Sequence, residues 1–155
     1  LHCVQPAHSG GEIRVIDHEI LFGILYRHDR RLALSLTQKD AMTIPENIIK
    51  GEIVRERQAG PVFYFDKCKL RMRYTQRKHN VIWKNDVKVR DALDILENTI
   101  HSNTDLIFSR RLKSGEGILS NNTPHRREAF EDASEIEYKR LVYRGRYNEV
   151  LNLIN

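Results

Sequence analysis

The residues best suited to carry chemistry lie in the C-terminal third of the chain. His125 comes directly after the polar turn Asn121-Asn122-Thr123-Pro124, and Arg140 and Arg144 lie further on, around Leu141, Val142 and Tyr143. Successive side chains of a strand point to opposite faces, so a strand here would place both arginines and Val142 on one face. A neutral imidazole can ligate a metal, and a guanidinium can bind a carboxylate through two parallel hydrogen bonds. If this face lines a pocket, His125 could hold a metal ion and Arg140 a carboxylate.

This stretch resembles the C-terminal signature of the Fe(II)- and 2-oxoglutarate-dependent dioxygenases of the taurine dioxygenase and clavaminate synthase-like superfamily. The resemblance rests on the run His125-x-Arg127-x-x-Phe130, on an arginine fifteen residues after the histidine, and on Gly10-Gly11-Glu12 before a short strand. It implies that His125 is the distal iron ligand and that Arg140 binds the 2-oxoglutarate carboxylate. Arg144 would be a second carboxylate or substrate contact. Arg73 and Asn122 are weaker substrate candidates, and Asn122 also fits a purely turn-forming role.

The first metal-binding motif of that family, His-x-Asp or His-x-Glu, is missing from the sequence. None of the seven histidines is followed two positions later by an acid. The family places this motif shortly before the Gly-Gly turn, so we expect it upstream of Leu1. Residues 1–155 would then be part of a single dioxygenase domain whose N-terminal part is absent. The alternative is a metal-free relative with a structural role. Ile13 is a second departure, because many relatives carry a hydroxyl residue there that hydrogen-bonds the cosubstrate.

The hydrophobic pattern predicts a β-rich chain with two or three helical excursions. Strands are expected over 1–4, 13–16, 48–57, 61–66, 70–75 and 106–108, and in the apolar run that enters the turn from Gly117. Helices are predicted after Asp17, over 32–36, after Asn85 or Asp86, and over 148–155. Val89, Leu93, Leu96 and Ile100 form one apolar stripe of the third helix. The resemblance implies a double-stranded β-helix, or jelly roll, with helices packed outside it.

Composition narrows the class of protein. The 155 residues are 40% hydrophobic and 30% charged, as in a globular domain. No apolar run approaches the roughly 18 residues of a membrane span, so we expect no membrane partner. The two cysteines match neither a zinc spacing nor a disulfide framework, which favours a reducing, cytoplasmic environment. The net charge of +5 indicates attraction to anions.

Together with the resemblance, these features predict an oxygenase that uses Fe(II), 2-oxoglutarate and O2. Its substrate would be a small, anionic or amino-acid-like molecule that it hydroxylates or otherwise oxidises. The alternative suggested by charge alone is a basic nucleic-acid-binding module. The 26 basic residues are scattered among 21 acids rather than aligned along one helix, which argues against that alternative. The sequence leaves open the identity of the substrate and whether the protein forms a homo-oligomer.

Overall fold

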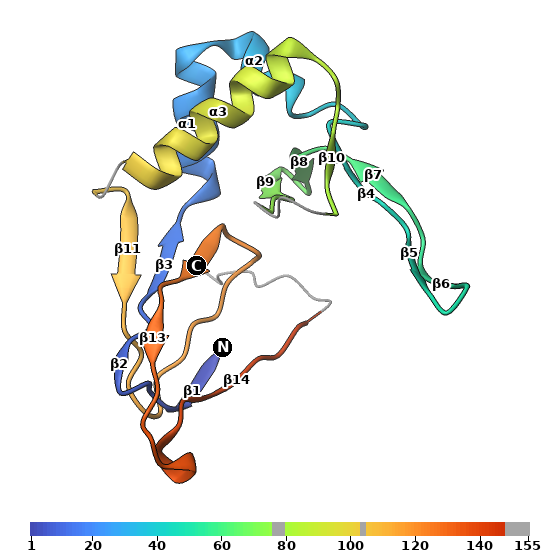
Figure 1. Cartoon of the computed structure of the whole chain (residues 1–155). Coiled ribbons are helices and arrows are strands. Elements are labelled where there is room, and N and C mark those ends of the chain that lie inside the picture. Colours follow the sequence, from blue (N-terminus) through green and yellow to red (C-terminus); the bar gives the residue numbers. More distant parts are fainter. Residues whose placement is uncertain (76–79, 103–104, 148–155) are drawn as a thin grey trace. The chain divides into compact units, whose positions relative to one another are not determined.

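The computed structural model describes residues 1–75, 80–102 and 105–147, and its contacts divide the chain into two compact units. The first unit combines residues 1–16 with the chain from residue 105 onward, and the second is 17–104. Strand β3 (Ile13–Ile16) ends where the second unit begins, and β11 (Ile107–Arg110) pairs antiparallel with it, as Figure 1 shows. The second unit is therefore inserted between two adjacent strands. The assignment of residues 1–155 to one dioxygenase domain stays a prediction.

β3 is the central strand of an antiparallel sheet in the first unit. β11 lies on one side of it, and β12 (His125–Arg127) lies on the other. β2 (Ser9–Gly10) and β13 (Phe130–Glu131) extend the ladder between β3 and β12, because they pair in the same register. Backbone hydrogen bonds from Gly11 to Ala129 and from Glu128 to Glu12 bridge the interruption between the two parts.

A second sheet of the first unit pairs the ends of the chain. β1 (His2–Gln5) lies antiparallel to β14 (Leu141–Tyr143), with Cys3 opposite Val142 and a register shift between Cys3 and Gln5. On the other edge of β1, residues 116–118 form an isolated bridge and three backbone or terminal hydrogen bonds. The strand predicted from Gly117 is reduced to this bridge. Arg140 and Arg144 flank the short β14 instead of lying within it, which differs from the expected strand.

The two sheets share one small core, as in a β-sandwich. Cys3 of β1, Ile13 of β3 and Leu112 are buried together, and Leu1, Val15, Ile118 and Val142 pack against them. A single-turn 3-10 helix, η1 (Ile136–Tyr138), precedes β14. We call the sheet face that carries Ile13 and Val15 the inner face, because both side chains belong to this core.

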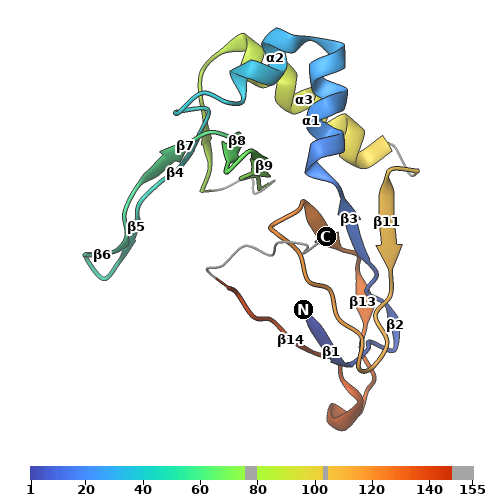
Figure 2. The same ribbon diagram turned by 180° about the vertical axis from the view of Figure 1, so that it is seen from behind.

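Three helices form the hydrophobic centre of the second unit, where α1 (His18–His28), α2 (Arg30–Ser35) and α3 (Val87–Ser102) pack on one another (Figures 1 and 2). Asp17 caps α1, and Asp29 ends α1 and caps α2. The Asp86 carboxylate accepts a hydrogen bond from the Lys88 amide at the start of α3. These carboxylates satisfy amides that the first helical turn leaves unpaired, and the caps predicted at Asp17 and Asp86 are confirmed. The fully buried residues include Leu21, Leu25, Leu36, Val89 and Leu96.

The strands of the second unit differ from the prediction at several places, since three short strands form at residues 42–44, 58–60 and 82–83, where no strand was expected. β4 (Met42–Ile44) pairs with β7 (Gln58–Gly60) and with β10 (Ile82–Trp83), and β8 (Phe63–Asp66) pairs with β9 (Lys69–Met72) as expected. The single strand predicted over 48–57 is wrong, because the chain reverses within it. β5 (Asn47–Ile49) and β6 (Glu52–Arg55) form a hairpin around Lys50 and Gly51, with φ angles of 52° and 85°. Positive φ at both central residues is the geometry of a tight hairpin turn.

At the level of the whole chain, the prediction of a β-rich fold with helical insertions is confirmed. The described strands do not close into a barrel, and the jelly roll stays a proposal. None of the helices in the described ranges is long and apolar enough to cross a membrane. The closing helix predicted over 148–155 lies outside the described residues.

Candidate functional site

His125 is the first residue of β12 and lies directly opposite Val15 of β3. Opposite residues of an antiparallel pair project to the same face, so His125 and Arg127 lie on the inner face. The His125 Nδ1 atom is 2.8 Å from the carbonyl oxygen of Thr123. A carbonyl only accepts, so Nδ1 carries the hydrogen, and in the neutral ring Nε2 presents its lone pair. A histidine that ligates a metal commonly has this arrangement.

Asn122 helps to form the turn before His125. Its backbone has a φ of 61°, in the left-handed region that asparagine tolerates better than most residues. The side chain is exposed. The conformation of the turn therefore explains why an asparagine occupies this position. The weaker prediction, that Asn122 contacts a substrate, stays a prediction.

Arg140 is placed just before β14 by its backbone and by an aromatic ring. Its amide donates to Asp132 Oδ1 over 2.7 Å, and its guanidinium carbon lies 5.2 Å from the centre of the Phe130 ring. The Arg127 guanidinium carbon lies 4.2 Å from the same ring centre. Such cation–π contacts orient a guanidinium without neutralising it. Among the residues that the structure describes, no carboxylate forms an ion pair with Arg140.

A small pocket in the first unit contains Arg140 in its wall. Arg111 and the backbone of Gly10 and Gly11 border it as well. The rest of the wall is largely apolar and comes from Cys3, Pro6, Ala7, Ile13, Leu112 and Val142. Arg111 is held in place because its guanidinium donates to the carbonyl oxygens of Ala7 and His8, over 2.6 and 2.9 Å. The pocket has room for about one water molecule, which is the size of one end of an anion rather than of a whole ligand.

The two glycines of this pocket allow a close backbone approach. Gly10 and Gly11 have φ angles of 65° and 79°. A Cβ on Gly10 would lie 2.4 Å from the Ala129 carbonyl oxygen, closer than any real side chain permits. Their position beside β13 therefore explains the Gly-Gly pair that the sequence shows. Ile13 follows as a buried core residue, and its side chain offers no hydrogen bond to a ligand.

Of the predicted site residues, this pocket contains Arg140 but not His125, Asn122, Arg144 or Arg73. Arg144 is exposed beyond β14, and the pocket wall contains Arg140 without it. Arg73 belongs to the second unit, where its guanidinium donates to the carbonyl oxygens of Met42, Gly60 and Gln58. Burial lowers the pKa of Arg73. These contacts give Arg73 an evident role in holding strands together.

Sequence reasoning did not single out Arg111, which contributes to the pocket wall. Its neighbour Arg110 pairs with Glu116 over 2.6 Å. Arg111 instead binds two carbonyl groups more than one hundred residues away in the sequence, and no local pattern indicates that contact. The sequence does contain a signal for Arg127, which also contacts the Phe130 ring, because both residues belong to the run that begins at His125.

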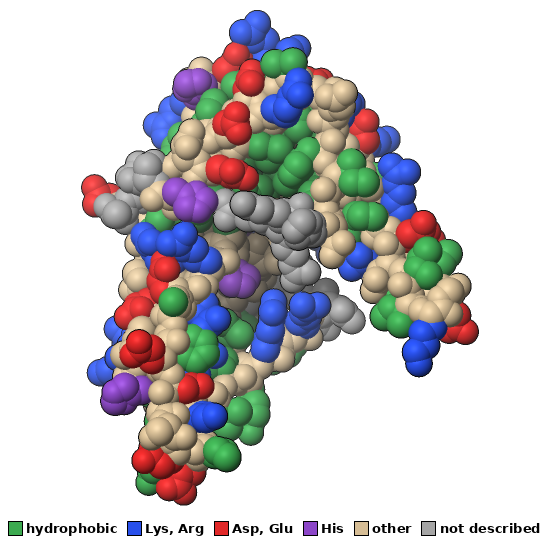
Figure 3. Space-filling view, viewed as in Figure 1, with side chains coloured by type: hydrophobic (Ala, Val, Ile, Leu, Met, Phe, Trp, Pro, Cys, Tyr) green, Lys and Arg blue, Asp and Glu red, His purple; other side chains and the backbone are tan. Residues whose placement is uncertain are grey.

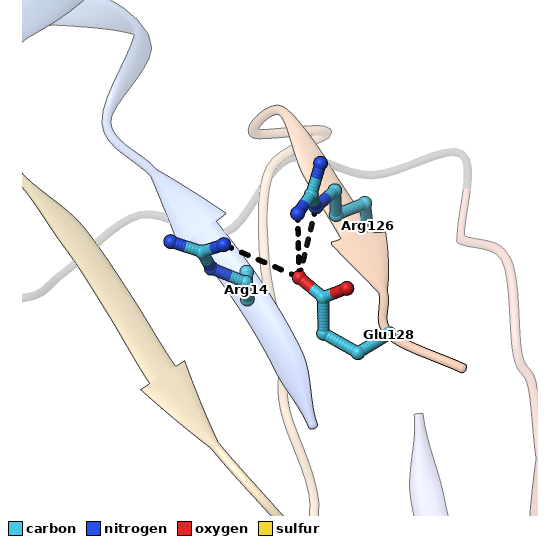
Figure 4. A network of polar contacts seen from close by, with 3 residues as sticks. All are labelled: Arg14, Arg126 and Glu128. Atoms are coloured by element: carbon cyan, nitrogen blue, oxygen red, sulfur yellow. Dashed lines mark hydrogen bonds and ion pairs between the residues drawn. The ribbon is translucent and has the colours of Figure 1, made fainter. Parts of the chain in front are cut away.

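The opposite face of the same ladder carries a separate network of charges. Arg14 and Arg126 lie opposite each other in the register, and Figure 4 shows both directed at one oxygen of Glu128. The distances to Glu128 Oε1 are 3.2 Å from Arg14 and 2.7 Å from Arg126. Arg126 is therefore bound to Glu128 on the face opposite the inner face. Its neighbours His125 and Arg127 lie on the inner face.

In comparisons with protein families and with curated proteins, no family and no protein matched this chain. Within the described ranges, no group of three or more His, Cys, Asp or Glu side chains is arranged to hold a metal ion. The geometry supplies one correctly oriented imidazole, on the inner face, and one guanidinium in a pocket wall that has no carboxylate partner among the described residues.

Proposed function

We propose that this chain belongs to an Fe(II)- and 2-oxoglutarate-dependent oxygenase that oxidises a small molecule with O2. The observation that carries the proposal is the pocket at Arg140. Arg140 is half-buried beside this pocket and forms no ion pair with a carboxylate among the described residues, so its guanidinium is available to an anion. The carboxylate of 2-oxoglutarate would be that anion, bound through two parallel hydrogen bonds.

The strand pairings support a jelly roll as the framework of this site. If β1 is the third strand of an eight-stranded jelly roll, then β3, β11, residues 116–118, β12 and β14 are the fourth to the eighth. That fold pairs its third strand with the sixth and eighth, and its fourth strand with the fifth and seventh. All four contacts occur: β1 with residues 116–118 and with β14, and β3 with β11 and with β12. The order of the strands therefore supports the fold, although the described strands leave it open.

The residues present fit one position of the metal site. His125 would ligate iron through Nε2, since the Thr123 carbonyl fixes the hydrogen on Nδ1. Iron in a site of two histidines and one carboxylate supplies the oxygen chemistry when bound. The proposal requires the second histidine and the carboxylate to come from outside the described residues. Arg140 would orient the cosubstrate, and the apolar wall of the pocket would limit the access of water to it.

Calorimetric titration of the complete protein with 2-oxoglutarate, under anaerobic conditions with Fe(II) present, tests the proposal. A bidentate charged pair contributes about 1.5–3 kcal/mol, so Arg140→Ala should weaken binding roughly ten- to a hundredfold. Arg126→Ala is the matched control, because Arg126 is bound to Glu128 on the other face of the ladder and should leave the affinity unchanged. An unchanged dissociation constant in Arg140→Ala, with the thermal transition intact, would rule out the assigned role.

A further inference from the structure

The second unit contains a β-ribbon whose outer half is exposed on both faces. β4 and β7 form its base, and the β5–β6 hairpin continues it beyond Pro45, as Figures 1 and 2 show. Met42, Thr43 and Gly60 at the base are buried, whereas every residue from Glu46 to Ala59 is exposed. Isolated two-stranded hairpins are marginally stable in water, and both edges of this one are free among the described residues.

Large aliphatic side chains occupy this exposed hairpin. Ile48, Ile49, Ile53 and Val54 have exposed fractions between 52% and 54%. Ile48 and Ile53 are directly opposite each other and share one face of the hairpin. In Figure 3 the hairpin, at the lower right, shows hydrophobic side chains between charged ones of both signs. A group of exposed aliphatic residues surrounded by charges is typical of a surface that contacts another protein.

We propose that this surface binds a second copy of the same chain, through antiparallel pairing of β5 with β5 around a two-fold axis. In an antiparallel pair, side chains that lie opposite each other share a face of the sheet. A two-fold axis perpendicular to the new sheet therefore passes between two copies of the same residue. With Ile48 opposite Ile48 of the second copy, Glu46 just before β5 comes near Lys50, the first turn residue of the second copy's hairpin, and this pair occurs twice. Neither Glu46 nor Lys50 forms an ion pair within the described chain. The edge strand is thus complementary to itself in charge.

The register also explains why β5, and not β6, is the paired edge. In β6, a two-fold axis at Ile53 would place Glu52 opposite Val54, and one at Val54 would place Ile53 opposite Arg55. Neither arrangement pairs opposite charges. The register between β5 and β6 also shifts next to Val54, and such a bulge disrupts the regular ladder of an edge. Pairing through β5 aligns Ile53, Ile48 and their two symmetry mates across one face of a four-stranded sheet.

The test is the oligomeric state of the protein, measured by sedimentation velocity over a concentration series. We expect a monomer–dimer equilibrium that shifts toward monomer at high salt. Ile48→Lys should raise the dimer dissociation constant roughly tenfold or more, because it places like charges opposite each other at the axis. Ile136→Lys is the matched control, since Ile136 is an exposed isoleucine of the first unit. The thermal transition of each variant should stay unchanged, because these side chains are exposed in the monomer.

A charge exchange across the axis makes the test specific. Glu46→Lys and Lys50→Glu should each raise the dissociation constant several-fold, because two attractive pairs become repulsive. The double variant should restore the original value within roughly twofold, since the pairs are then reversed but complementary. A protein that stays monomeric at every concentration would overturn the proposal and leave the hairpin to a different partner. A dimer unaffected by Ile48→Lys, or a double variant weaker than both single variants, would also overturn it.

Discussion

At the scale of single residues, one carboxylate balances two positive charges on the face of the β3–β12 ladder that lies opposite the inner face. Arg14 and Arg126 are opposite each other, and like charges at such positions destabilise a sheet. Glu128 accepts hydrogen bonds from both guanidinium groups. The bonds from Arg126, and then that from Arg14, hold the pKa of Glu128 below its ordinary value of 4.5.

Glu128→Gln should therefore lower the thermal transition temperature at neutral pH. A carboxyl group with a lowered folded-state pKa stabilises the fold above its unfolded-state pKa, and this contribution is lost as the pH falls through the folded-state pKa. The difference between wild type and variant should thus be constant above about pH 5 and shrink toward zero in more acidic solution. Thermal unfolding across this pH range measures it, with Glu97→Gln on the exposed side of α3 as the control. A difference that persists unchanged at acidic pH would contradict the charge-based explanation.

The candidate site could be predicted from sequence only where its residues are close together in the chain. His125, Arg127 and Phe130 form one short run, and the interpretation of Arg140 depends on its spacing from that run. Arg111 reaches the pocket because β11 and the residues after it are brought beside residues 7 and 8, and this contact depends on the whole fold. The outward direction of Arg126 follows from the alternation of a strand, but its carboxylate partner does not.

At the scale of elements, Arg73 connects the end of the β8–β9 hairpin to the base of the β4–β7 ribbon. Its guanidinium donates to one carbonyl of β4 and to two carbonyls of β7. A Cβ on Gly60 would lie 3.2 Å from the Arg73 guanidinium carbon, so the glycine leaves room for this contact. The position thus has a structural explanation that is independent of any substrate.

Arg73→Met should lower the free energy of unfolding by about 1–3 kcal/mol, because it keeps an unbranched apolar stem and leaves partly buried carbonyl groups without this donor. Chemical denaturation monitored by circular dichroism measures the loss. Arg90→Met is the matched control, since Arg90 is exposed on α3 and should change stability little. A variant as stable as wild type that loses affinity for the substrate would instead favour the predicted role in substrate binding.

Elements were predictable where a local signal defines both ends. The carboxylates of Asp17 and Asp86 mark the starts of α1 and α3, and the stripe from Val89 to Leu96 is buried as its helical spacing indicates. The hairpin of β5 and β6 was mistaken for one strand because Lys50, a residue with no preference for positive φ, occupies its turn beside Gly51. Its aliphatic residues give no burial signal either, since all of them are exposed.

At the scale of the whole molecule, the pairing of distant segments determines where the site lies. β1 pairs with β14, and β3 pairs with β12, so residues at the start of the chain meet residues more than one hundred positions later. Hydrophobic periodicity predicts the existence of such strands but not their partners. The resemblance to a known superfamily supplied the only expectation about their order. The proposed jelly roll contains the four contacts described above, those of β1 with residues 116–118 and β14 and those of β3 with β11 and β12.

The count of metal ligands leads to a prediction for the 155-residue chain studied by itself. A single imidazole cannot hold Fe(II) against water, because affinity in this part of the metal series depends on several ligands in a fixed geometry. His125 is the one ligand that the proposal assigns to the described residues, which contain no cluster of three potential ligands. We expect less than one equivalent of bound iron after anaerobic reconstitution, no release of succinate from 2-oxoglutarate, and little further loss of iron in His125→Ala.

The same measurement on a longer chain separates an incomplete site from an incorrect assignment. If an additional segment supplies a histidine and a carboxylate, iron binding and succinate release should both arise, and His125→Ala should then abolish them together. His2→Ala is the matched control, because His2 is an exposed histidine of β1 that pairs with Tyr143 in the other sheet. One equivalent of tightly bound iron in the 155-residue chain, with turnover of 2-oxoglutarate, would mean that this chain holds further ligands and that the requirement for an additional segment is wrong.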